Sequence, residues 1–77
     1  LVERPSPTNG SGPRPDLSDR QLEVLRLLAA GNNVTEIASE LDISAHTVRS
    51  HLRRIFEELE VSSQVEAVVR GLREGLI

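Results

Sequence analysis

The stretch VTEIASELDISAHTVRSHLRRIFEEL, residues 34–59, decides the fold. Apolar residues recur with helical spacing over about 34–41, residues 42–44 interrupt the pattern, and a second helical segment covers about 45–59. Ser44 is a preferred N-cap residue for that second segment. A three-residue break between two short helices is the spacing of a helix-turn-helix, whose helices lie roughly 90–120° apart. Because many small helical bundles share this spacing, it predicts two helices and a tight turn but is weak evidence for a function.

Helical signals also flank this stretch on both sides. Ser18 has a glutamine three residues later, the spacing of a capping box, and Gly31 fits the end of a helix over about 19–30. Ser62 is expected to cap a last helix over about 63–74. No segment alternates as a β-strand would. The sequence therefore predicts an all-α domain of four helices.

The residues expected in the core share helical spacing within each segment. They are Leu22, Leu25, Leu28 and Ala29, with Val24 and Leu27 beside them, then Ile37, Ala38 and Leu41, and then Val48, Leu52, Ile55 and Leu59. The last helix carries an apolar stripe of Val65, Val68, Val69 and Leu72. The apolar stripe of the last helix has two possible roles. It packs on the first helix, or it stays partly exposed and pairs with another copy, because exposed apolar patches mark interfaces. For a dimer interface we predict Val65, Val69 and Leu72.

The first sixteen residues differ in composition from the rest of the chain. All four prolines lie there, among glycine, serine, threonine and asparagine. Proline lacks an amide donor, and this stretch has little apolar material to bury. We predict a flexible linker over 1–16 and a folded domain over 17–77. A nucleic-acid-binding arm is the alternative, although the stretch has balanced charges. Because the chain starts at Leu1, we expect it to be a fragment of a longer protein.

Composition argues against several classes of protein. The 77 residues include no cysteine, which excludes disulfides, thiolate metal sites and thiol catalysis. His46 and His51 are five residues apart and point in different directions around a helix, so no metal or other cofactor is expected. Four short helices leave little room for a catalytic pocket, and no glycine-rich phosphate loop is present, so no enzyme is expected. No apolar run reaches the roughly 20 residues of a membrane span. We expect a cytoplasmic binding module with no membrane partner.

The segment over 45–59 carries a basic face. The net charge is −3, yet every basic residue is arginine, and residues 45–56 contain three arginines and no acid. At 100° per residue, the polar side chains gather nearly opposite the apolar stripe. Hydroxyl groups also lie near the start of the helix, where its dipole favours a phosphate. The predicted DNA-binding residues are Ser44, His46, Thr47, Arg49, Ser50, Arg53 and Arg54.

A less specific interpretation fits the same residues. Arginine on an exposed helix face is common, and Arg53–Glu57 and Arg54–Glu58 have the spacing of ion pairs that stabilise a helix. His51 lies at the edge of the apolar stripe and is expected to pack or to form a hydrogen bond there.

Residues 17–77 as a whole resemble the LuxR-type helix-turn-helix of bacterial transcription factors, the NarL/FixJ class. The matching pieces are L-S-x-R-x-x-E-V-L-R-L-L-A-x-G at 17–31, E-I-A-x-x-L-x-I-S-x-x-T-V-R-x-H at 36–51, and the E-A-V and G-L-I at 66–68 and 75–77. The resemblance implies a four-helix fold whose second and third helices read DNA. It also implies that the fourth helix pairs two copies on a two-fold operator. A regulatory domain, either a phosphoacceptor receiver or a small-ligand sensor, would precede the linker.

The resemblance also implies roles for single residues. Arg49, Ser50 and Arg53 would reach bases or phosphates, and Thr47 would approach a phosphate. The chain departs from the family where basic residues are usual: Val34-Thr35 lacks the cation of the second helix, Glu57-Glu58 replaces basic residues, and Gln64 replaces an arginine. Because each lost cation removes a phosphate contact, we expect a weak monomer that depends on dimerisation.

Two functions follow from these observations. The first is sequence-specific binding of double-stranded DNA, as a homodimer or as a heterodimer with a related regulator, with RNA polymerase as a possible further partner. The alternative is a protein-interaction domain on the same fold that uses the acidic end of the third helix. A charge reversal at Arg49 distinguishes them, since it should abolish DNA binding and spare a protein contact made elsewhere.

Overall fold

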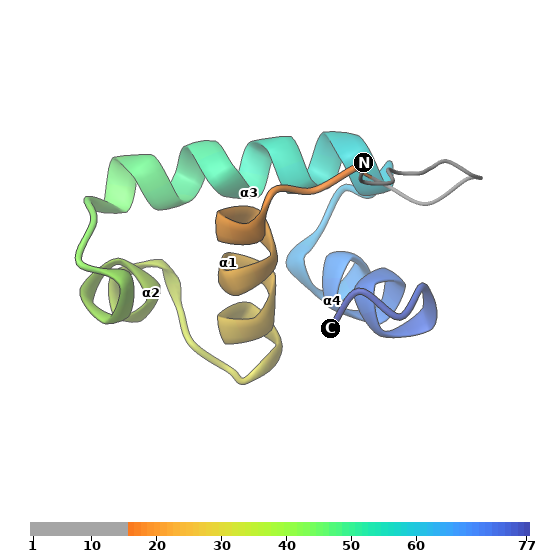
Figure 1. The fold of residues 1–77 in the computed structure, drawn as a ribbon, viewed down its shortest axis with the longest axis horizontal. Helices are drawn as coiled ribbons and strands as arrows, with labels where there is room; N and C mark the ends of the chain where they lie inside the picture. The colour runs from red at the N-terminus through yellow and green to blue at the C-terminus, as the bar shows by residue number, and fades with distance from the viewer. Residues whose placement is uncertain (1–15) are drawn as a thin grey trace, which may run out of the picture.

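The computed structural model describes residues 16–77, which form four α-helices (Figure 1). The helices are α1 (Asp19–Ala29), α2 (Val34–Leu41), α3 (Ala45–Leu59) and α4 (Gln64–Arg73). No strand occurs in this part of the chain. The predicted all-α class with four helices is therefore confirmed. The expected linker over 1–16 lies, apart from Asp16, outside the described residues.

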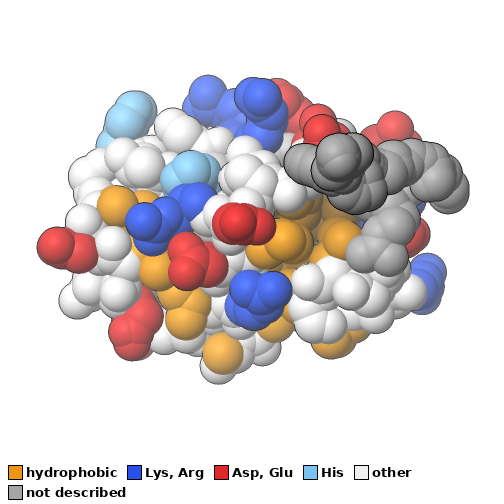
Figure 2. All heavy atoms as spheres, viewed as in Figure 1, with side chains coloured by type: hydrophobic (Ala, Val, Ile, Leu, Met, Phe, Trp, Pro, Cys, Tyr) orange, Lys and Arg blue, Asp and Glu red, His pale blue; other side chains and the backbone are white. Residues whose placement is uncertain are grey.

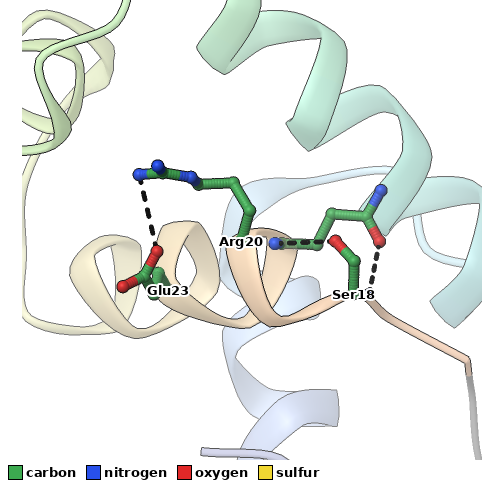
Figure 3. Close-up of polar contacts among 4 residues, drawn as sticks. Ser18, Arg20 and Glu23 are labelled. Carbon is green, nitrogen blue, oxygen red and sulfur yellow. Dashed lines mark hydrogen bonds and ion pairs between the residues drawn. The ribbon is translucent and has the colours of Figure 1, made fainter.

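Each helix begins at a small polar residue whose side chain accepts a hydrogen bond from a backbone amide. At α1, the Ser18 Oγ accepts from the amide of Gln21 at 3.2 Å, and the Gln21 Oε1 accepts from the amide of Ser18 at 2.9 Å (Figure 3). One turn on, Arg20 and Glu23 form an exposed ion pair at 3.5 Å (Figure 3). Such caps satisfy amides that have no partner within the helix, so they fix where each helix starts.

The cap of α4 is Ser63 and not the predicted Ser62. The Ser63 Oγ accepts from the amide of Glu66 at 3.1 Å, whereas Ser62 donates its amide and its hydroxyl to the Glu66 carboxylate at 2.9 and 3.2 Å. A cap residue bonds the third residue of the helix, and only the second serine stands three positions before Glu66. Smaller differences occur at two C-termini, where Ala30 and Glu74 follow their helices as C-cap residues.

Two helices end at non-glycine residues in the left-handed conformation. Asp42 after α2 and Glu60 after α3 both have φ 58°. Beyond them the chain turns back, with the amide of Ile43 donating to Ala38 O and that of Val61 donating to Phe56 O, both at 3.0 Å. Glycine is the usual residue at such positions, because a Cβ makes this conformation costly. Both turns thus store some strain, and the Asp42 turn sets the angle between α2 and α3.

In Figure 1, α3 runs along one side of the molecule, α1 stands roughly perpendicular beneath it, and α2 and α4 lie on either side of α1. All four helices contribute to the buried apolar core. Its residues are Val24, Leu25, Leu28, Ile37, Ala38, Val48, Leu52, Ile55, Leu59 and Ala67. The core face predicted for α3 is confirmed in full. On α1 the prediction is wrong at Ala29, which is exposed, whereas Val24, expected beside the core face, is fully buried. The reason is that α1 packs against α2, α3 and α4, which turns its buried arc toward Val24.

The inward face of α4 consists of small residues, and the apolar stripe, for which the sequence left two roles open, is exposed. Ala67 and Gly71 are buried, whereas the side chains of Val65, Val69 and Leu72 are 73, 44 and 60% exposed. A Cβ at Gly71 would lie 2.9 Å from the Leu25 Cδ2 atom, so α4 lies so close to α1 that a larger residue would require the Leu25 side chain to shift. Close packing selects the two small residues for the core, and the larger ones face solvent.

Candidate nucleic-acid interface

The side of α3 away from the core presents a row of polar side chains. Arg49, Ser50, Arg53 and Arg54 are exposed, as is His46 near the start of the helix. Figure 2 shows basic side chains gathered along the edge of the molecule formed by α3. A straight, exposed helix of fifteen residues with such a face has the dimensions that a DNA major groove accepts. Thus α3 brings together five of the seven predicted DNA-binding residues on its surface.

The arginines of α3 are free of ion pairs within the described part of the chain. Residues 16–77 form two ion pairs, Arg20–Glu23 on α1 and Arg70–Glu74 at the end of α4. The Arg53–Glu57 and Arg54–Glu58 pairs of the less specific interpretation are not formed between these residues. An acid placed before a base is the better order in a helix, and here the order is reversed. The guanidinium groups on α3 therefore keep their hydrogen-bond donors for another molecule.

The N-terminus of α3 carries the remaining two predicted residues. The Ser44 Oγ accepts from the amide of Thr47 at 3.0 Å, and the two hydroxyl oxygens lie 2.9 Å apart. Among the described helices, α3 alone has no acid in its first turn, whereas the others carry Asp19, Glu36 or Glu66 there. The partial positive charge of this helix end is thus not neutralised by a carboxylate of its own.

A shallow hollow of about 490 Å³ runs along α3 between the starts of α2 and α4. Its lining residues come from three helices and from the turn after α3. They are Val34, Arg49, Leu52, Arg53, Phe56, Glu57, Val61 and Gln64. The hollow contains Glu57 and Gln64, two of the positions where the chain departs from the basic residues usual in LuxR-type domains. A carboxylate therefore stands beside Arg49 and Arg53 on the candidate surface.

Sequence reasoning missed the apolar part of this hollow. Phe56 is half-buried and lies between the core and the basic face, with Val34 and Val61 at either side. The signal was present, because at 100° per residue Phe56 lies only about 20° from Arg49 around α3. These three side chains are part of the apolar lining of the hollow that Arg49 and Arg53 also line.

The acidic side chains lie at the edges of the candidate surface. Glu57 and Glu58 occupy the last turn of α3, and Glu60 follows it, so the charge changes sign along the helix. One carboxyl outside this region is perturbed: hydrogen bonds from the Ser62 amide and hydroxyl lower the pKa of Glu66. The basic half of α3 is therefore a compact patch on a molecule whose net charge is −3.

Within residues 16–77, no three His, Cys, Asp or Glu side chains gather closely enough to hold a metal ion. His46 is exposed and His51 half-buried, on different sides of α3. None of the described helices has the length and apolar character of a membrane span.

Comparisons with known proteins agree with this geometry. Residues 15–70 match the family described as bacterial regulatory proteins, luxR family. The transcriptional regulatory protein DesR of Bacillus subtilis is 48% identical over 59 residues, which are 77% of this chain and 30% of DesR. The probable transcriptional regulatory protein NarL of Mycobacterium tuberculosis is 40% identical over 63 residues, 82% of this chain and 29% of that protein.

A solved structure shares the fold. The crystal structure of the response regulator ChrA, from a heme-sensing two-component system, aligns with a TM-score of 0.79 and 35% sequence identity. The alignment covers 86% of this chain and 33% of ChrA. The chain thus spans about a third of the length of the relatives that it matches.

Proposed function

The chain belongs to the LuxR family of bacterial regulatory proteins, and from this premise we propose that it binds specific sites on double-stranded DNA as the effector domain of a transcriptional regulator. The observation that carries the proposal is the exposed basic face of α3, whose arginines form no ion pair with residues 16–77. In the proposed complex α3 lies in the major groove, and α2 supports it from behind. Residues 17–77 are the DNA-binding domain, and 1–16 join it to a regulatory domain.

Each predicted residue has a role set by its chemistry. Arg49 and Arg53 stand one turn apart and suit the O6 and N7 acceptors of guanine, because a guanidinium donates two parallel hydrogen bonds. Ser50 lies beside them and can donate to or accept from a base edge. Such contacts carry the sequence specificity.

Four further residues are proposed to hold the phosphate backbone. Ser44 and Thr47 present hydroxyl groups at the positive end of α3, which is a favourable site for a phosphate oxygen. His46 and Arg54 flank the base-reading row on α3 and are exposed. Backbone contacts of this kind fix the position of the helix in the groove without reading sequence.

A single copy is expected to bind DNA weakly. The hollow that borders the arginines contains the Glu57 carboxylate and the uncharged Gln64. Each phosphate contact contributes about 0.9 to the slope of log affinity against log salt. A surface with few cations therefore binds DNA more weakly, and with a smaller salt dependence, than a surface with many. Useful affinity then requires two copies on two half-sites.

Dimerisation through α4 is proposed to supply the second copy. Val65, Val69 and Leu72 form an exposed apolar stripe on α4. Two half-sites about 10 base pairs apart would let both α3 helices enter the groove on one side of the duplex. The partner is a second copy or a related regulator, and RNA polymerase is a possible further contact. The site of action is the cytoplasm, where bacterial DNA is found.

A protein-interaction domain is the second candidate function. It is favoured by the carboxylates Glu57, Glu58 and Glu60, which cluster at the C-terminal end of α3. On this alternative the acidic end binds another regulator, and the basic face has a minor role.

A charge reversal tests the proposed function against the alternative. Arg49→Glu should lower the affinity for duplex DNA at low salt by at least about tenfold, because it replaces a donor by a carboxylate. Arg26 is an exposed residue of α1, and Arg26→Glu is the matched control because it changes the net charge equally. Fluorescence anisotropy with a labelled duplex measures both. Equal losses in the two variants would contradict a specific role for α3 and favour the protein-interaction domain.

A further inference from the structure

The exposed stripe on α4 is bordered on one flank by opposite charges. Glu66 and Arg73 are seven residues apart, so they stand two turns apart on the same side of the helix. Both line a shallow hollow of about 320 Å³ beside Val65 and Val69. The other flank, by the helical rotation of 100° per residue, carries Gln64 and no charged side chain.

Neither charge on this flank is neutralised by the described chain. Arg70 pairs with Glu74 at 3.2 Å, and Arg73 has no ion pair with any residue of 16–77. The Glu66 Oε1 atom accepts the hydrogen bonds from Ser62, and no described donor bonds its Oε2 atom. Those bonds lower the pKa of Glu66 and keep it ionised. Arg73 and one carboxylate oxygen of Glu66 are therefore available on the edge of the stripe, and the exposed Glu60, which precedes α4, lines the same hollow.

Two-fold symmetry determines which charges meet when two such stripes face each other. In an antiparallel pair of helices, the axis keeps each flank on its own side and exchanges the two ends of the helix. The flank with Arg73 then lies along the same flank of the second copy, with Arg73 opposite Glu66. A parallel pair would place this flank against the uncharged one. Opposite charges therefore meet only in the antiparallel arrangement, where the symmetry gives two equivalent Arg73–Glu66 contacts.

We propose that α4 pairs antiparallel with α4 of a second copy, and that two Arg73–Glu66 contacts beside the apolar stripe select this chain as its own partner. The inference rests on the dimer proposed above and deepens it. A related regulator with a different charge at either position would bring like charges together or leave one unpaired. Rim charges of this kind contribute modestly to affinity but decide between partners.

Self-association of the 77-residue chain tests the proposal. Sedimentation equilibrium up to millimolar concentration should show a mass approaching twice the 8.5 kDa of one chain. Arg73→Glu should raise the dimer dissociation constant by about tenfold, equal to about 1.4 kcal/mol. High salt should reduce the difference between the dissociation constants of the variant and the wild type, because it screens the charges. Arg26→Glu should leave the constant unchanged. Circular dichroism melts confirm that each variant is folded.

A mixture of two variants gives a second, independent readout. Arg73→Glu has two acids on the flank, and Glu66→Arg has two bases, so each should self-associate poorly. Mixed together they restore both contacts, and heterodimers should form about as tightly as wild-type dimers. This outcome does not depend on Glu66 keeping its hydrogen bonds to Ser62, provided that the variant remains helical.

The possible failures are distinct. If the wild type dimerises, while Arg73→Glu behaves like Arg26→Glu and the mixture gains nothing, the Arg73–Glu66 pairing is wrong and the dimer stands. If the wild type stays monomeric to millimolar concentration, α4 dimerisation and the pairing fail together. DNA binding by α3, which is measured separately on Arg49→Glu, is unaffected by either result.

Discussion

Replacing Glu57 by arginine should convert a weak point of the candidate surface into a phosphate contact. Glu57 is exposed in the last turn of α3 and lines the same hollow as Arg49 and Arg53. Its carboxylate would repel the phosphates that the two arginines approach. The substitution removes that repulsion and adds a donor at the same place, without touching the core.

The size of the effect follows from the salt dependence of DNA binding. One additional phosphate contact steepens the slope of log affinity against log salt by about 0.9. Between 50 and 200 mM salt the concentration changes fourfold, so the variant should lose about 3.5-fold more affinity than the wild type. At 50 mM it should bind about tenfold more tightly, as expected for about 1.4 kcal/mol from one charge-assisted contact.

Fluorescence anisotropy at four salt concentrations measures both quantities on one duplex. Glu40→Arg is the matched control, because Glu40 is an exposed acid on the side of α2 next to α1, beside Arg26 and Leu41. It changes the net charge equally but adds no contact at the hollow on α3. If Glu40→Arg steepens the slope as much as Glu57→Arg, the gain reflects net charge and the assignment of the hollow to DNA is refuted.

Three further predictions concern stability. Gly71→Ala should lower the free energy of unfolding by about 1 kcal/mol, because overpacking against the fully buried Leu25 outweighs the better helix propensity of alanine; an unchanged urea midpoint would refute the close approach of α1 and α4. Glu60→Gly should raise it by about 0.5–1 kcal/mol in the same assay by relieving the φ of 58°, and a loss would show that the turn is not strained. Because hydrogen bonds lower the pKa of Glu66 from 4.5, its ionised carboxylate contributes to stability fully above that pH, and the contribution is lost as the pH falls through the pKa of the folded state. Glu66→Gln should therefore make the melting temperature less dependent on pH in this acid range. An unaltered dependence of the melting temperature on pH would contradict the contacts with Ser62.

The helix count and the core face of α3 could be predicted because local signals act alone there. Polar N-caps mark where helices start, and the stripe from Val48 to Leu59 has one side to bury. Predictions failed where tertiary packing decides. Which apolar residues of α1 are fully buried depends on how three neighbouring helices surround it, so Ala29 is exposed whereas Val24, expected beside the core face, is buried.

The inward face of α4 shows the same limit more clearly. Periodicity located the stripe of Val65, Val69 and Leu72 but left open whether it packs on α1 or stays exposed, because apolar spacing does not say which face is inward. The structure buries the small residues Ala67 and Gly71, and a Cβ at Gly71 would already lie 2.9 Å from the Leu25 Cδ2 atom. Spacing alone also could not show that Arg53 and Arg54 form no ion pair with Glu57 and Glu58, since ion-pair geometry depends on side-chain positions.

The measurement that tests the central claim most directly is an NMR titration of the isotope-labelled chain with random-sequence duplex DNA, at low and then moderate salt. It requires no knowledge of the operator. We expect chemical-shift changes concentrated at residues 44–54, with those of Arg49 and Arg53 among the largest, and their reversal by salt. A flat response at low salt, or changes confined to α4 and the acidic end of α3, would contradict DNA binding through α3.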